Sequence, residues 1–140
     1  MSTKQKAKRN TRIFLSYASE DRSSAEEVIK HLTTVPNLQI FNDNSISAGE
    51  DWESIIRREL DKSDYFLVLL SPASIRSKWV QFELGAAWGL DKFIIPVVTT
   101  HDVISKIPVD LAGLRIIEME SLKNPDTLNE ILESHQKAAA

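Results

Sequence analysis

Short apolar runs alternate with segments of helical spacing along almost the whole chain, and this alternation most constrains the fold. The segments between the runs carry apolar residues three or four positions apart, as amphipathic helices do. Alternation with short links predicts a parallel sheet with helices on both faces. We therefore predict an α/β fold, a flavodoxin-like three-layer sandwich with a five-stranded parallel sheet. The predicted strands are Arg12–Tyr17, Leu38–Phe41, Asp64–Leu70, Lys92–Val98 and Arg115–Glu118.

Four helical stretches are expected between and after these strands. The first covers about residues 20–35, and Trp52 is expected to anchor the second in the core. Ser71-Pro72 is typical of a helix start, because proline suits the first helical position. We expect this third stretch to be irregular, with Ser77 starting a second segment. Asn124–His135 forms the last helix.

The length and charge of the chain indicate one domain with a flexible basic start. The chain has 140 residues and a formal net charge of −3, which gives no reason to expect nucleic acid or an anionic membrane as a partner. Residues 1–10 carry four basic side chains and no acidic one, so we predict a solvated tail there. The domain is expected over residues 11–136. Residues 137–140 are interpreted as a frayed end or a point where a longer protein was cut.

The chain contains no cysteine, which excludes disulfides, thiolate zinc sites and a cysteine nucleophile. Its three histidines lie far apart with no ligand spacing, so no metal site is expected. The longest apolar runs, Tyr65–Leu70 and Phe93–Val98, are too short to span a bilayer. No apolar signal segment follows the basic start. These features favour a cytoplasmic protein.

Trp79 and Glu83 are the candidate site that stands out. They are four residues apart on a predicted helix and therefore share a face. An aromatic ring beside a carboxylate can bind a flat cationic ring and stabilise positive charge, although such pairs are most often structural. Ligands of parallel α/β sheets bind beyond the carboxyl ends of the strands. The loops expected there are 16–22, 42–51, 71–80 and 98–108.

Several families with this architecture are excluded by their missing motifs. A receiver domain needs an aspartate at the end of the third strand, where this chain has Leu69-Leu70-Ser71-Pro72. A dinucleotide fold needs Gly-x-Gly-x-x-Gly after the first strand, but the four glycines stand at positions 49, 85, 89 and 113. A phosphate-binding P-loop is absent as well.

Five motifs in order resemble the TIR (Toll/interleukin-1 receptor) domain family, over about residues 11–135. The segment that ends with Glu83-Leu-Gly-Ala-Ala-Trp88 is similar to bacterial members. The motifs are the opening strand Arg12–Asp21, the BB loop Ile40–Trp52, the strand Ser63–Pro72, the Trp-x-x-x-Glu signature Trp79–Glu83 and the strand Lys92–Pro96. Of these, Ser63–Pro72 resembles the family's third strand, and Lys92–Pro96 resembles its fourth strand.

The resemblance implies cleavage of NAD⁺ between nicotinamide and ribose, with NAD⁺ as substrate and no further cofactor or metal. The reaction passes through a ribosyl cation, which Glu83 would stabilise as the catalytic residue. Trp79 would offer its ring to the pyridinium. Ser16 and Tyr17, at the end of the first strand, and Asp43, in the BB loop, are the other expected substrate contacts.

Structural alternatives stay open for these residues. Trp79 and Tyr17 also suit packing, and Asp43 suits a turn. Glu83 is expected in a surface cleft, so that its replacement leaves the fold intact. Trp88 is expected in the core, on the other stripe of the same helix.

Three functions compete. The first is an NAD⁺ nucleosidase that forms ADP-ribose or a cyclic isomer. The resemblance implies that such an enzyme acts as a bacterial immune (antiviral) effector, activated by self-assembly and fused to or partnered with a sensor. The second is a non-catalytic adaptor that binds other TIR domains through the BB loop. The third is a nucleotide- or nucleoside-processing transferase of related fold.

Overall fold

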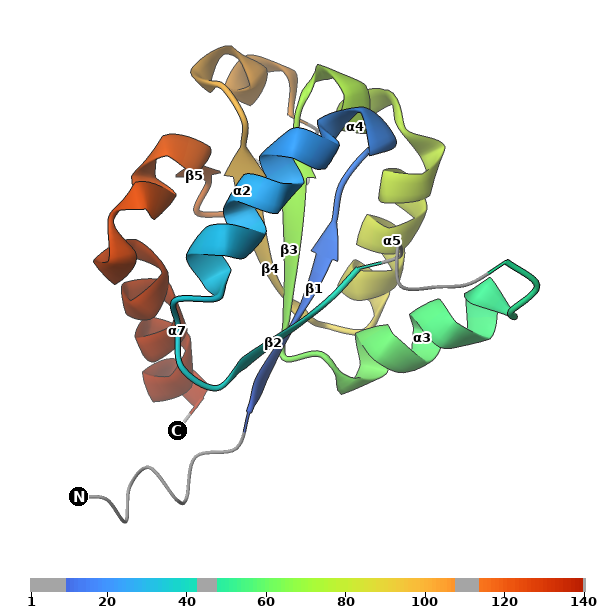
Figure 1. Ribbon diagram of the computed structural model, residues 1–140, viewed down its shortest axis with the longest axis horizontal. Helices are drawn as coiled ribbons and strands as arrows, with labels where there is room; N and C mark the ends of the chain where they lie inside the picture. Colours follow the sequence, from blue (N-terminus) through green and yellow to red (C-terminus); the bar gives the residue numbers. More distant parts are fainter. Residues whose placement is uncertain (1–9, 43–47, 108–113, 140) are drawn as a thin grey trace.

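The computed structural model describes residues 10–42, 48–107 and 114–139, and side chains as far as residue 133. Its centre is a five-stranded parallel sheet with the strand order β2-β1-β3-β4-β5 (Figure 1). The predicted α/β fold with a flavodoxin-like arrangement is confirmed. The strands are β1 (Thr11–Ser16), β2 (Leu38–Phe41), β3 (Tyr65–Leu70), β4 (Phe93–Val98) and β5 (Ile117–Glu118).

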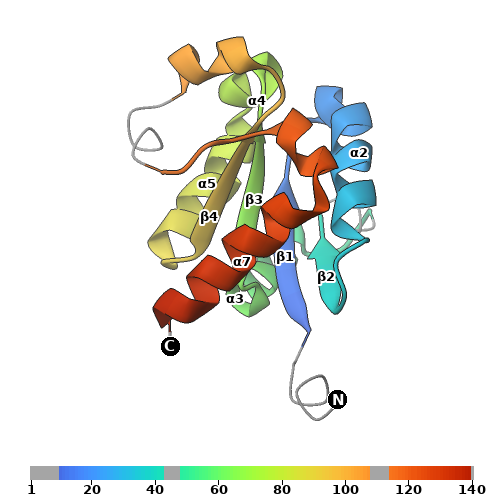
Figure 2. The same ribbon diagram turned by 90° about the vertical axis from the view of Figure 1, so that its left-hand side faces the viewer.

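Helices cover both faces of the sheet (Figure 1 and, turned by 90°, Figure 2). Among the described helices, none is long and apolar enough to cross a membrane. One face carries α2 (Arg22–Leu32) and α7 (Pro125–Ala139), and the other carries α3 (Trp52–Lys62), α4 (Pro72–Arg76) and α5 (Lys78–Gly89). Short 3-10 helices lie at Ser19–Asp21, His101–Lys106 and Met119–Lys123.

The alternation of side chains along the strands divides the core into two layers. In β1, Ile13 and Leu15 pack against α2 and α7, whereas Phe14 packs against α3 and α5. All six residues of the central strand β3 are buried, which is typical of a strand covered on both faces. The sheet therefore lies between two apolar layers, one on each of its faces.

Two details of the predicted elements need adjustment. The first helix begins only at Arg22, after a 3-10 turn, and no side chain caps it. The last strand, predicted over Arg115–Glu118, covers only Ile117–Glu118. The predicted interruption of the third helical stretch is confirmed, because α4 ends at Arg76 and Ser77 caps α5.

The predicted core positions of two tryptophans are wrong. The side chain of Trp52 is 46% exposed and that of Trp88 is 51% exposed. Trp52 is the first residue of α3, so the helix turns only Ile56 and Leu60 onto the sheet. Trp88 lies one position beyond the buried Ala87, and this turns it about 100° away from the sheet.

Candidate active site

The candidate residues Ser16 and Glu83 meet where β1 ends against the middle of α5. Glu83 on α5 has no exposed surface, and Ser16, the last residue of β1, is 1% exposed. The hydroxyl Oγ of Ser16 donates a hydrogen bond of 2.6 Å to Oε1 of Glu83. A carboxylate inside a protein is costly unless such bonds stabilise it, so the bond from Ser16 stabilises Glu83 in its buried position.

The inward direction of Glu83 follows from the buried stripe of α5. Val80, Glu83 and Ala87 are the buried residues of the helix, spaced three and four apart. The Ser77 side chain caps α5 by accepting a hydrogen bond from the backbone N–H of Val80, which sets where the helix begins. The expectation of a surface cleft for Glu83 is therefore wrong. The helix presents this carboxylate to the sheet rather than to solvent.

The loops after β1 and β3 are joined beside this site. The Ser71 hydroxyl donates a hydrogen bond to the Asp21 carboxylate, and it also accepts one from the backbone N–H of Ser74. Ser74 Oγ in turn accepts a hydrogen bond from the backbone N–H of Ser71, which completes a capping box for α4. The carboxyl ends of β1 and β3 are thus held in one arrangement.

Three aromatic rings form a cluster outside Glu83, which we call the aromatic cluster. It consists of Trp52 from α3 and of Trp79 and Phe82 from α5, with ring centroids 4.9 to 6.1 Å apart. Trp52 and Phe82 are each 46% exposed, whereas Trp79 is partly buried. The cluster offers aromatic surface to a flat partner next to the helix that carries Glu83.

The α3 end of the aromatic cluster is held by a helix cap. The Asp51 side chain accepts hydrogen bonds from the backbone N–H and the hydroxyl of Ser54. These bonds hold the pKa of Asp51 below its ordinary value of 3.8. The cap fixes the position of Trp52, the next residue, at the start of α3.

Of the remaining predicted site residues, Tyr17 does not join this site. Tyr17 is buried in the core layer against α2, whereas Ser16 faces α5. The tyrosine ring therefore packs on the opposite side of the sheet from Glu83. Asp43 lies outside the described residues. Among the described side chains, no three His, Cys, Asp or Glu residues form a group that could hold a metal ion.

The sequence does not single out several residues in and beside the site. It predicts that the loops 16–22 and 71–80 lie at one edge of the sheet, but the contact between Asp21 and Ser71 within these loops is seen only in the structure. The spacing of Trp52 with Ile56 and Leu60 predicts a core position, which is wrong. The available signal was its place at the first turn of α3, where a helix often extends beyond the sheet that it covers.

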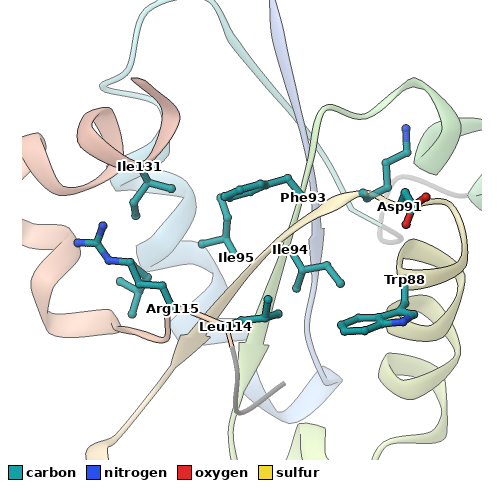
Figure 3. Close-up of a pocket in the computed structure, with 10 residues that line it drawn as sticks. Trp88, Asp91, Phe93, Ile94, Ile95, Leu114, Arg115 and Ile131 are labelled. Carbon is teal, nitrogen blue, oxygen red and sulfur yellow. The ribbon is translucent and has the colours of Figure 1, made fainter. Parts of the chain in front are cut away.

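The site chemistry can be stated from these contacts. A fixed carboxylate stabilises positive charge that develops near it, and an adjacent aromatic face attracts a cationic ring. Glu83 has no exposed surface, so a substrate reaches the carboxylate only if its surroundings move. A cavity of about 550 Å³ lies elsewhere, at the outer edge of β4 (Figure 3).

Comparison with known proteins identifies a family over most of the chain. The family model described as the TIR domain matches residues 13–132. A curated relative, named a probable 2' cyclic ADP-D-ribose synthase from Methanobrevibacter olleyae, is 23% identical over 130 residues. The match covers 86% of this chain but only 37% of that relative.

Solved structures share the fold. The TIR domain of a Toll-related receptor from Hydra magnipapillata superposes with a TM-score of 0.69 at 17% identity, covering 87% of this chain and 95% of that one. A metazoan TIR-STING receptor from C. gigas gives a TM-score of 0.67 at 22% identity, covering 81% of this chain and 37% of that one.

Proposed function

Because this chain belongs to the TIR domain family, we propose that it is an NAD⁺ nucleosidase that releases nicotinamide from NAD⁺. The observation that carries the proposal is the buried Glu83 carboxylate, held by Ser16 at the carboxyl end of β1. The name of the relative, a cyclic ADP-ribose synthase, supports the same class of substrate. The match spans about two fifths of that relative, so the activity is proposed for this domain alone.

In the proposed reaction, the bond between ribose C1′ and the pyridinium nitrogen breaks. Its electron pair moves to the ring nitrogen, and nicotinamide leaves as a neutral molecule. The leaving group therefore needs no proton donor, and one carboxylate is sufficient. Glu83 stabilises the ribosyl cation. Water then adds to C1′ and releases a proton, which gives ADP-ribose, or a nucleophile of the same molecule adds and gives a cyclic isomer.

The neighbouring residues take defined parts in this proposal. The Trp79 ring attracts the pyridinium, an interaction of roughly 0.5–2 kcal/mol, and Trp52 and Phe82 extend the same aromatic surface. Ser16 orients Glu83 rather than contacting the substrate, since its hydroxyl is buried against the carboxylate. For Asp43, a role in lining the pocket remains our proposal, as does a supporting role for Tyr17.

The burial of Glu83 suggests how the activity is restrained. A substrate cannot touch a carboxylate without exposed surface, so the isolated chain requires an opening step. We assign this step to self-association of TIR domains, in keeping with an immune effector that a fused or separate sensor activates.

A non-catalytic adaptor is the second candidate, and the exposed aromatic cluster favours it. Trp and Phe are enriched in the buried centres of protein interfaces. Trp52 and Phe82, both 46% exposed, would suit a contact between two TIR domains. Such a protein would not need a carboxylate at position 83.

The decisive experiment measures NAD⁺ turnover by the purified chain at high concentration, with products separated by chromatography and identified by mass. Wild type is expected to release nicotinamide, and Glu83→Gln is expected to release none. Glu83→Gln retains the shape of the side chain and an acceptor for Ser16, and circular dichroism verifies its fold. No release by wild type, even after forced clustering, would favour the adaptor.

A further inference from the structure

The groove at the outer edge of β4 arises because β5 is so short. Ile117 and Glu118 pair only with Val97 and Val98, so within the described residues no strand pairs with this side of Phe93–Pro96. On the two faces of the sheet, α5 and α7 flank this edge. Figure 3 shows Trp88 of α5 on one side of the opening and Ile131 of α7 on the other.

The backbone at this edge is a poor partner for another strand. The N–H of Thr99 donates to the carbonyl of Leu70 on β3, so alternate residues of β4 point their N–H groups toward β3. The backbone groups of Ile94 and Pro96 therefore point to the groove, and proline has no N–H to donate. With Ile94 as the one donor along Phe93–Pro96, a compact ligand suits the groove better than an added strand.

The lining suits a small molecule with a flat apolar body. The cavity measures about 550 Å³, within the range of about 300–1,000 Å³ typical of small-molecule sites. Trp88 is 51% exposed and Phe93 is 37% exposed, and Ile94 and Ile95 line the cavity from opposite faces of the sheet. Exposed aromatic side chains beside a concave apolar surface favour a planar ligand.

The charged residues of the lining indicate where an anionic group of the ligand would bind. The Lys92 ammonium already donates to the carbonyls of Asp61 and Ser63. Arg115 is exposed and, among the described residues, takes part in no hydrogen bond or ion pair. Asp91 lies beside Trp88, at the far end of the opening from Arg115 (Figure 3). An anionic group is therefore attracted to the Arg115 end, whereas at the other end the positive charge of Lys92 offsets the negative charge of Asp91.

We propose that this groove binds a small planar aromatic carboxylate, whose ring lies between Trp88 and Phe93 and whose anionic group pairs with Arg115. The planar guanidinium of arginine accommodates a carboxylate through two parallel hydrogen bonds. The groove is a site separate from Glu83, and this inference does not rest on the proposed NAD⁺ chemistry.

The test uses two fluorescent probes with the same aromatic body. 1-Anilinonaphthalene-8-sulfonate carries one anionic group, and N-phenyl-1-naphthylamine carries none. We expect the sulfonate to bind one site per chain and to be displaced by 1-naphthoate but not by 1-naphthalenemethanol. Arg115→Ala should weaken binding of the sulfonate about tenfold and leave the neutral probe within about twofold, because only the charge pair is lost.

Two variants separate the groove from the rest of the surface. Trp88→Ala should weaken both probes about tenfold, because it removes one aromatic wall. Arg57→Ala is the matched control for Arg115→Ala, because Arg57 is an exposed arginine outside the groove and outside the aromatic cluster, and it should change the binding of neither probe. Sulfonate binding that is unaffected by both Arg115→Ala and Trp88→Ala, or that is weakened as strongly by Arg57→Ala, would overturn the proposal. Binding that weakens as the protein concentration rises would assign the groove to a second copy of the chain instead.

Discussion

The buried contact between Ser16 and Glu83 sets the expectations at the scale of single residues. The Ser16 hydroxyl donates a hydrogen bond to the Glu83 carboxylate, and both side chains are closed off from water. Removing either side chain removes this bond from a buried polar group, which generally costs more than the bond contributes. Stability and activity therefore have to be measured together at this site.

Glu83→Ala is predicted to lower the free energy of unfolding by about 1–3 kcal/mol, because it leaves a cavity and orphans the Ser16 hydroxyl. Glu83→Gln should equal or exceed the wild type in stability, since a neutral amide fills the same space without the cost of burying a charge. Urea unfolding of the three proteins measures the difference. Equal stability of Glu83→Ala and wild type would contradict the burial of this side chain.

Ser16→Ala is predicted to reduce kcat about 10- to 100-fold with a smaller change in KM, because a misplaced carboxylate slows the chemical step more than it weakens substrate binding. This outcome depends on the proposed NAD⁺ turnover. Steady-state kinetics on nicotinamide release tests it. A rise in KM with kcat unchanged would instead indicate that Ser16 contacts the substrate directly.

At the scale of elements, the start of α3 determines where Trp52 sits in the aromatic cluster. Asp51 accepts two hydrogen bonds from Ser54 at this helix end, and its pKa is lowered by them. A carboxylate at a helix N-terminus is stabilised by the orphan N–H groups there. The carboxylate of Asp61, at the other end of α3, has no such N–H groups to stabilise it, so Asp61 is a suitable control for Asp51.

Asp51→Ala is predicted to lower Tm at pH 7, and Asp61→Ala, in the last turn of α3, is not. The folded pKa of Asp51 lies below the unfolded value, so its stabilisation is present above about pH 3.8 and is lost as the pH falls through the lowered folded value. The Tm difference between wild type and Asp51→Ala should therefore shrink toward pH 2. Thermal melts across this range measure it, and a difference that is constant with pH would speak against the cap.

At the scale of the whole molecule, the closed site predicts a dependence on assembly. Specific activity of the wild type is expected to rise with protein concentration, because in the proposed mechanism contacts between copies open the way to Glu83. Turnover and light scattering over the same concentrations measure this. Constant specific activity from a protein that remains monomeric would rule out gating by self-association.

The aromatic cluster supplies a control for that experiment. If Trp52 and Phe82 form the contact between copies, Phe82→Ala should shift the rise in activity to higher concentration without changing the activity of the fully assembled protein. If they hold the substrate instead, Phe82→Ala should raise KM at every protein concentration.

Most of the architecture could be predicted from the sequence. The period of apolar residues distinguishes strands from helices, and the alternation of the two implies a parallel sheet with helices on both faces. The break between α4 and α5 was also predictable, because Ser77 is a residue type that caps helices. These features depend on local chemistry, which a sequence carries in full.

The tertiary structure alone decided which stripe of α5 faces the sheet. Helical spacing places Trp79 and Glu83 on one side of α5, but it does not tell which side meets β1. Contact with the sheet turned Glu83 inward and left Trp88 outside, and the short β5 opened the groove beside it. Burial and long-range pairing arise between elements, so a pattern within one element cannot determine them.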